Sequence, residues 1–150
     1  MYRNMIDELV AWQEDPNHPI LVLKGAKGVG KTWCVIDFAE AFFAHRIHIE
    51  FEKDTVLKEL FLVPHELSFI DEQLELLTDL DLQGNHREDT LLIFDDVQVE
   101  EDLFAGVMQY ARQKPNLSVI VIASWFGMLS AEGILSEGEI LFAVAHEPGV

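Results

Sequence analysis

The chain has 150 residues, a length that suits a single domain, and 49% of them are hydrophobic, which is enough to build a buried core. It carries 27 acidic side chains against 10 Lys and Arg, and the resulting net charge of −17 would repel a nucleic-acid backbone. No apolar run approaches the roughly 18 residues of a membrane span, and residues 1–8 lack the basic start and apolar stretch expected of a signal peptide. A single cysteine excludes an internal disulfide. Composition therefore favours one cytoplasmic domain over residues 1–150 and argues against direct DNA or RNA binding.

The hydrophobic pattern predicts helices and strands in alternation. Apolar residues at helical spacing indicate helices, and short continuous apolar runs indicate strands buried in a parallel sheet. In chain order we predict a helix over 4–14, a strand over 20–23, a helix over 32–44, a strand over 47–51, helices over 55–62 and 68–80, a strand over 90–96, a helix over 100–113, a strand over 118–123, a short helix over 126–135 and a strand over 139–145. This order is typical of an α/β fold in which helices cover both faces of a mostly parallel sheet.

Residues 1–19 would then be a leading helix and its connection, and residues 20–150 the core of the domain. Two capping signals refine the helix boundaries. Asp54 is placed to cap the helix that starts at residue 55. Ser68 and Asp71 resemble a capping box that would open the helix over 68–80. The side chains of that helix that we expect to face inward are Ile70, Leu74 and Leu77.

A glycine-rich stretch links the first predicted strand to the next helix. Residues 24–32 read Lys-Gly-Ala-Lys-Gly-Val-Gly-Lys-Thr and contain the pattern G-x-x-x-x-G-K-T. In a strand–loop–helix context this pattern predicts a phosphate-binding loop, because its glycines let backbone amides approach a ligand and the helix N-terminus favours an anion. The alternative is a glycine-rich turn that binds nothing. The residues we predict to contact a nucleotide are Gly25, Ala26, Lys27, Gly28, Val29, Gly30, Lys31, Thr32 and Trp33.

Four of these positions have more specific expectations. Lys31 would reach the β- and γ-phosphates, and the Thr32 hydroxyl would ligate Mg²⁺. Lys27 either contacts phosphate or is an exposed loop lysine, and exposure is the favoured interpretation. Trp33 and Trp125 could form the wall of a base pocket, but packing in the core is the favoured alternative for both.

The second buried strand ends in two carboxylates. With a phosphate loop upstream, Asp95 is predicted to hold a water on the metal that Thr32 ligates, and Asp96 to orient the attacking water. Asp96 is one methylene shorter than the Glu found there in many ATPases, a loss of reach of about 1.5 Å that can lower a rate by about a hundredfold. Ser124, at the end of the next strand, is a candidate sensor of the γ-phosphate or the lytic water. The alternatives are that Asp96 and Ser124 are turn or capping residues.

Other candidate sites are weaker. No arginine finger can be assigned to Arg3, Arg46, Arg87 or Arg112, although Arg87 or Arg112 could act in a neighbouring copy. His45 and His48 are three residues apart but lack companion ligands, which argues against a zinc site. Cys34, near the start of its helix, is expected to be a buried structural thiol.

With these residues in hand, the chain resembles the AAA-type P-loop ATPases of a prokaryotic group whose ATPase domain is followed by a C-terminal domain of unknown function. The similar segments are residues 6–12, 21–32, 48–54, 90–98 and 122–124. The resemblance implies a three-layer P-loop NTPase fold with strand order 5-1-4-3-2. The C-terminal domain of that group is not expected within these 150 residues.

The resemblance also implies ATP or ADP on residues 25–32, Mg²⁺ near Thr32 and Asp95, and water activation near Asp96. Two departures are visible. Asp96 stands where the group usually has the longer Glu, and Gly28 stands where Gln is common.

Three functions follow from these residues. The first is Mg²⁺-dependent ATP hydrolysis coupled to a conformational change, with a homo-oligomer or a protein client as partner. The second is a nucleotide-gated switch with little hydrolysis. The third is a small-molecule kinase, which the lack of an arginine-rich lid disfavours; the chain also lacks the Asn-Lys-x-Asp motif of GTPases.

Overall fold

The computed structural model describes residues 2–16, 18, 20–25, 31–86, 88–98, 101–124 and 140–144. Its elements alternate between helix and strand much as the hydrophobic pattern predicts. In chain order they are α1 (Tyr2–Glu14), β1 (Leu21–Gly25), α2 (Lys31–Phe42), β2 (His45–Glu50), α3 (Thr55–Leu62), α4 (Leu67–Thr78), β3 (Thr90–Gln98), α5 (Glu101–Arg112), β4 (Ser118–Ser124) and β5 (Ile140–Val144). The helix predicted over 126–135 lies outside the described residues.

The five strands form one sheet in the order β2-β3-β4-β1-β5. Read from the β5 edge, this is the expected order 5-1-4-3-2. Every neighbouring pair is parallel, with Leu21 opposite both Ile120 and Ile140, and Ile93 also opposite Ile120. The carboxyl ends of the strands therefore share one edge of the sheet, where ligands of such folds bind.

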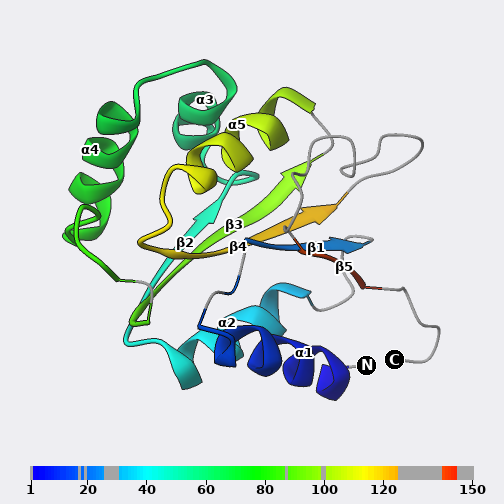
Figure 1. Ribbon diagram of the computed structural model, residues 1–150. Helices are drawn as coiled ribbons and strands as arrows, with labels where there is room; N and C mark the ends of the chain where they lie inside the picture. Colours follow the sequence, from blue (N-terminus) through cyan, green and yellow to red (C-terminus); the bar gives the residue numbers. More distant parts are fainter. Residues whose placement is uncertain are drawn as a thin grey trace.

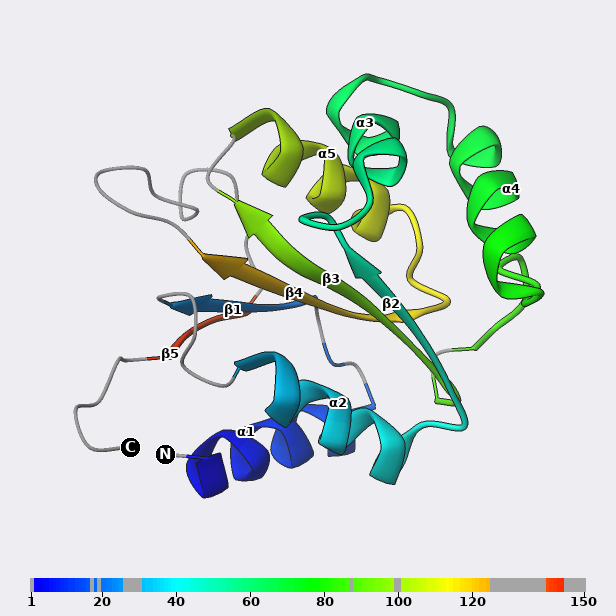
Figure 2. The ribbon, with the colours of Figure 1, turned by 180° about the vertical axis from the view of Figure 1, so that it is seen from behind.

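Helices cover both faces of the sheet, which gives three layers (Figures 1 and 2). α1 and α2 lie on one face, and α3, α4 and α5 lie on the other. Because strand side chains alternate, Ile120 and Ile122 join the core beneath α1 and α2, whereas Val119 and Val121 join the larger core beneath α3 and α5. The α/β, three-layer prediction is confirmed.

The cap predicted for α3 is present, but the capping box predicted for α4 is wrong. The backbone N–H of Leu57 donates to Asp54 Oδ1 at 3.0 Å. α4 begins at Leu67, one residue before Ser68, and its N-cap position makes no side-chain hydrogen bond. Asp71 is instead buried inside the molecule.

Asp71 is buried because side chains distant in sequence satisfy its carboxylate, and Gln83 Nε2 also donates to Oδ2 at 3.1 Å. Lys114 Nζ lies 3.0 Å from Asp71 Oδ2, and the Tyr110 hydroxyl donates to Oδ1 at 2.7 Å. Burial and the neighbouring Asp71 raise the pKa of Tyr110 above its usual range. A buried charge is tolerated only when it is paired and hydrogen-bonded. Asp71 therefore takes part in this tertiary network instead of capping α4.

The end of α4 also differs from the prediction. Ile70 and Leu74 are buried as expected, but Leu77 is 63% exposed. The helix stops at Thr78 rather than residue 80, because Asp79 adopts the left-handed conformation (φ 58°) that terminates many helices. Within the described ranges, no helix is long and apolar enough to cross a membrane.

Candidate functional site

β1 and α2 flank the glycine-rich stretch. β1 ends at Gly25 and α2 begins at Lys31, so the strand and the helix that the sequence predicted on either side of this stretch are present. The contacts predicted for residues 26–30 lie outside the described residues, and the same holds for the side chain of Lys31. The nucleotide contacts of these residues stay predictions.

The first turn of α2 meets the end of β3. The Thr32 hydroxyl lies 3.1 Å from both Oδ1 and Oδ2 of Asp95, a residue 63 positions later in the chain. Asp95 is only 7% exposed. The fold thus brings together the hydroxyl that the sequence predicted as a Mg²⁺ ligand and the carboxylate that it predicted to hold a water on that metal.

A third side chain, which the sequence did not single out for this site, also contacts Asp95. His48 Nε2 lies 2.8 Å from Asp95 Oδ2, and His48 is largely covered. An ionised carboxylate only accepts hydrogen bonds, so Nε2 carries the proton in this contact. The other ring nitrogen, Nδ1, lies 3.7 Å from Glu50 Oε1.

The position of His48 could have been inferred from two signals taken together. In the run 47–50, polar residues alternate with apolar ones, so His48 and Glu50 share one face of β2. β2 lies beside β3, with Glu50 opposite Asp95. Because side chains two residues apart on a strand point the same way, a polar face of β2 can reach a carboxylate at the end of β3.

β3 does not end at Asp96 as predicted but continues to Gln98. Its register against β4 shifts between Phe94 and Val97, where three steps along β3 match two along β4. Asp96 lies inside this bulge with φ 58°. One extra residue bends a strand and redirects its side chains, and such bulges are frequent beside functional sites.

Ser124 and Trp33 were two further candidates. Ser124 ends β4 and pairs in register with Gln98, so its backbone lies at the edge of the sheet that carries Asp95. Its side chain is outside the described part. Trp33 is 73% exposed on the first turn of α2, so the favoured expectation that it packs in the core is wrong. Trp125 lies outside the described residues.

Cys34 is a buried residue of α2, as expected for a structural thiol. Burial, with a smaller contribution from Asp37, raises its pKa to about 11. A thiol with this pKa carries almost no thiolate at neutral pH, and the thiolate is the nucleophilic form. Burial and the raised pKa both agree with a structural role for Cys34.

The chain is similar to known proteins over most of its length. The model of a family described as AAA domain matches residues 17–137. Similar solved structures include Drosophila ORC bound to DNA (TM-score 0.55, 14% identity, 95% of this chain and 40% of that one) and C. elegans PCH-2 (TM-score 0.53, 13% identity, 95% and 41%). At such identity the likeness concerns the fold, and this chain spans about two fifths of each of those chains. Among curated protein sequences, none matches this one significantly.

Proposed function

Because the chain belongs to the AAA domain family, a P-loop group that binds ATP, we propose that it hydrolyses ATP in a Mg²⁺-dependent reaction coupled to a conformational change. The observation that carries the proposal is the contact of the Thr32 hydroxyl with both oxygens of Asp95. It joins the end of the phosphate-loop motif to the end of a central strand, which is where this chemistry places its metal ligands.

The donor set fits the proposed ion. Mg²⁺ is a hard cation that prefers oxygen ligands, and Thr32 and Asp95 both supply oxygen atoms. Asp95 is nearly buried, so its carboxylate contacts neighbouring side chains rather than solvent. When bound, Mg²⁺ would neutralise charge on the phosphates.

The remaining roles belong to the chain's own residues. The amides of residues 25–31 and the Lys31 ammonium would hold the phosphates. Trp33, which is exposed on the first turn of α2, would contact the base. Asp96 would orient the attacking water, and Ser124 would sense the γ-phosphate or that water. Catalysis of this kind is mostly positioning and electrostatic stabilisation.

A nucleotide-gated switch with little hydrolysis is the second candidate. The observation that favours it is Asp96, which has a shorter side chain than Glu and lies in a bulge with a left-handed backbone. A carboxylate misplaced by about 1 Å can cost about a hundredfold in rate.

Phosphate release from Mg-ATP, measured over a range of protein concentrations, tests both candidates. Turnover that disappears in Lys31→Ala and falls strongly in Asp96→Ala is the result expected of an ATPase. A rate per protomer that rises with concentration would indicate that a neighbouring copy contributes to the site. If the wild type binds nucleotide but releases phosphate no faster than Lys31→Ala, the result would favour the nucleotide-gated switch. No binding of ATP or ADP by the wild type would overturn both.

A further inference from the structure

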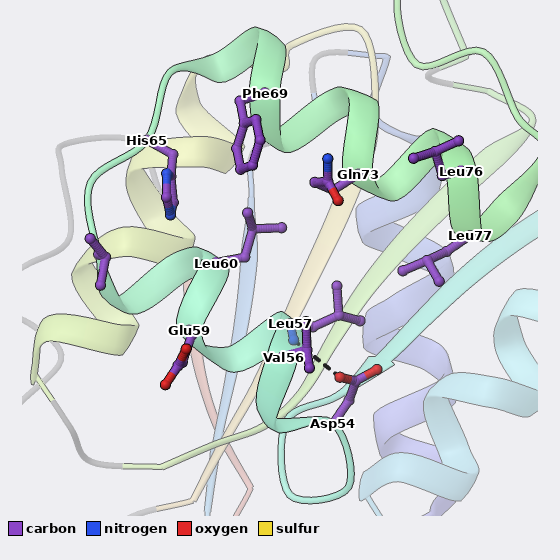
Figure 3. Close-up of a pocket in the computed structure, with 11 residues that line it drawn as sticks. Asp54, Val56, Leu57, Glu59, Leu60, His65, Phe69, Gln73, Leu76 and Leu77 are labelled. Carbon is purple, nitrogen blue, oxygen red and sulfur yellow. Dashed lines mark hydrogen bonds between the residues drawn. The ribbon is translucent and has the colours of Figure 1, made fainter.

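The outer surface of α3 and α4 carries an apolar groove of about 750 Å³ (Figure 3). Its lining includes none of the residues proposed to bind nucleotide or metal. Leu57 and Leu60, both nearly buried, line it from α3. α4 contributes Phe69, Gln73, Leu76 and Leu77, with His65 in the connection between the two helices.

Exposed apolar side chains are concentrated in this groove. Within the described residues, seven large apolar side chains are exposed, and five of them line it. The five are Val56, Val63, Phe69, Leu76 and Leu77. Single exposed apolar side chains are ordinary, but a contiguous patch of them marks an interaction surface.

The surroundings of the groove are acidic. Residues 52–77 contain seven acidic and two basic side chains, and among the acids only Asp71 is buried. Asp54 and Glu59 themselves line the groove. A partner would therefore meet apolar side chains in the middle and negative charge at the rim.

We propose that this groove, lined by α3 and α4, is the docking site for an amphipathic helix of a partner protein, with an apolar stripe and Lys or Arg beside it. The apolar centre and acidic rim are complementary to such a helix, which inserts anchors at i, i+3 or i+4, and i+7. α4 has 12 residues and is about 18 Å long, so about three turns of the partner fit along it.

The charge of the chain disfavours a second copy as the occupant. Two copies that met through this groove would bring together two acidic rims on molecules that each carry a net charge of −17. Like charges facing each other across an interface oppose association.

Isothermal titration calorimetry with two designed peptides tests the proposal. One peptide is an 18-residue helix with Leu at the anchor spacing and Lys elsewhere; the other has the same composition with the Leu positions scrambled. The wild type should bind the first at least about tenfold more tightly than the second. Equal affinity for the two peptides would mean attraction to an acidic surface alone and would overturn the proposal.

Two pairs of variants locate the binding. Leu76→Gln/Leu77→Gln alters two exposed side chains and keeps good helix formers, so it should fold and should lower affinity for the first peptide to the scrambled level. Glu59→Lys should weaken binding more than Glu8→Lys, an identical charge change at an exposed position of α1. Undiminished binding by the Leu76/Leu77 variant would overturn the proposal. So would concentration-dependent dimerisation of the wild type that this variant abolishes, because the groove would then belong to a second copy.

Discussion

Asp95 is a nearly buried carboxylate with two side-chain hydrogen-bond donors from different elements. Thr32 reaches it from α2 and His48 reaches it from β2. Hydrogen bonds to charged groups contribute about 1.5–3 kcal/mol each, and they fix the orientation of the carboxylate. Under the proposed function, His48 therefore positions Asp95, the carboxylate of the proposed Mg²⁺ site.

We expect His48→Leu to raise the Mg²⁺ concentration needed for half-maximal binding of a fluorescent ATP analogue by about 10–100-fold, the usual cost of losing such a supporting contact. His48→Gln, whose amide N–H can take the place of Nε2, should retain most of the affinity. Measuring the Mg²⁺ midpoint and the melting temperature of both variants separates positioning from folding. An unchanged midpoint in the Leu variant would show that His48 does not position Asp95.

At the scale of the elements, α5 crosses α3 at close range. A Cβ built on Gly106 would lie 2.0 Å from the Phe61 carbonyl oxygen and 3.1 Å from its carbonyl carbon. Both atoms belong to the backbone, so a side-chain movement cannot relieve the clash. Gly106 is therefore present for packing, although glycine is a poor helix former.

Helix propensity and packing predict opposite effects of Gly106→Ala on the free energy of unfolding. Propensity alone would stabilise α5 by about 1 kcal/mol. The clash forces the two helices apart, and overpacking costs about 1–3 kcal/mol or more, so we expect net destabilisation in urea unfolding. Gln109→Ala, at an exposed position of the same helix, is the matched control and should change stability by less than about 0.5 kcal/mol. A more stable Gly106→Ala protein would contradict the close packing.

At the scale of the molecule, the net charge of −17 makes the charges on the surface predominantly negative, so that they repel one another. Self-repulsion of this kind destabilises the compact state, and salt screens it over about 10 Å at 0.1 M. We expect the melting temperature to rise by about 2–4 °C between 10 mM and 500 mM NaCl. For a domain of this length, that rise corresponds to a gain of about 1 kcal/mol in the free energy of unfolding. A melting temperature that falls with NaCl would show that local ion pairs outweigh the overall repulsion.

The features that the sequence predicted are those with a local cause. The spacing of apolar residues along the chain predicts which segments are helices and which are buried strands. The glycines with Lys31 and Thr32 predict a phosphate loop, and that stays a prediction. Asp54 caps α3 by accepting a hydrogen bond from the backbone N–H of Leu57, three residues later. The strand order was also predicted, although from the resemblance to a family rather than from spacing.

The features that only the tertiary structure decided depend on partners distant in the chain. Asp71 could not be recognised as a buried anion because its partner, Lys114, lies 43 residues later. His48 meets Asp95 only because β2 and β3 are neighbours, and the groove exists only because α3 and α4 both line it. A hydrogen bond or an apolar contact depends on distance in space, and distance along the chain predicts it only within a turn or a helix.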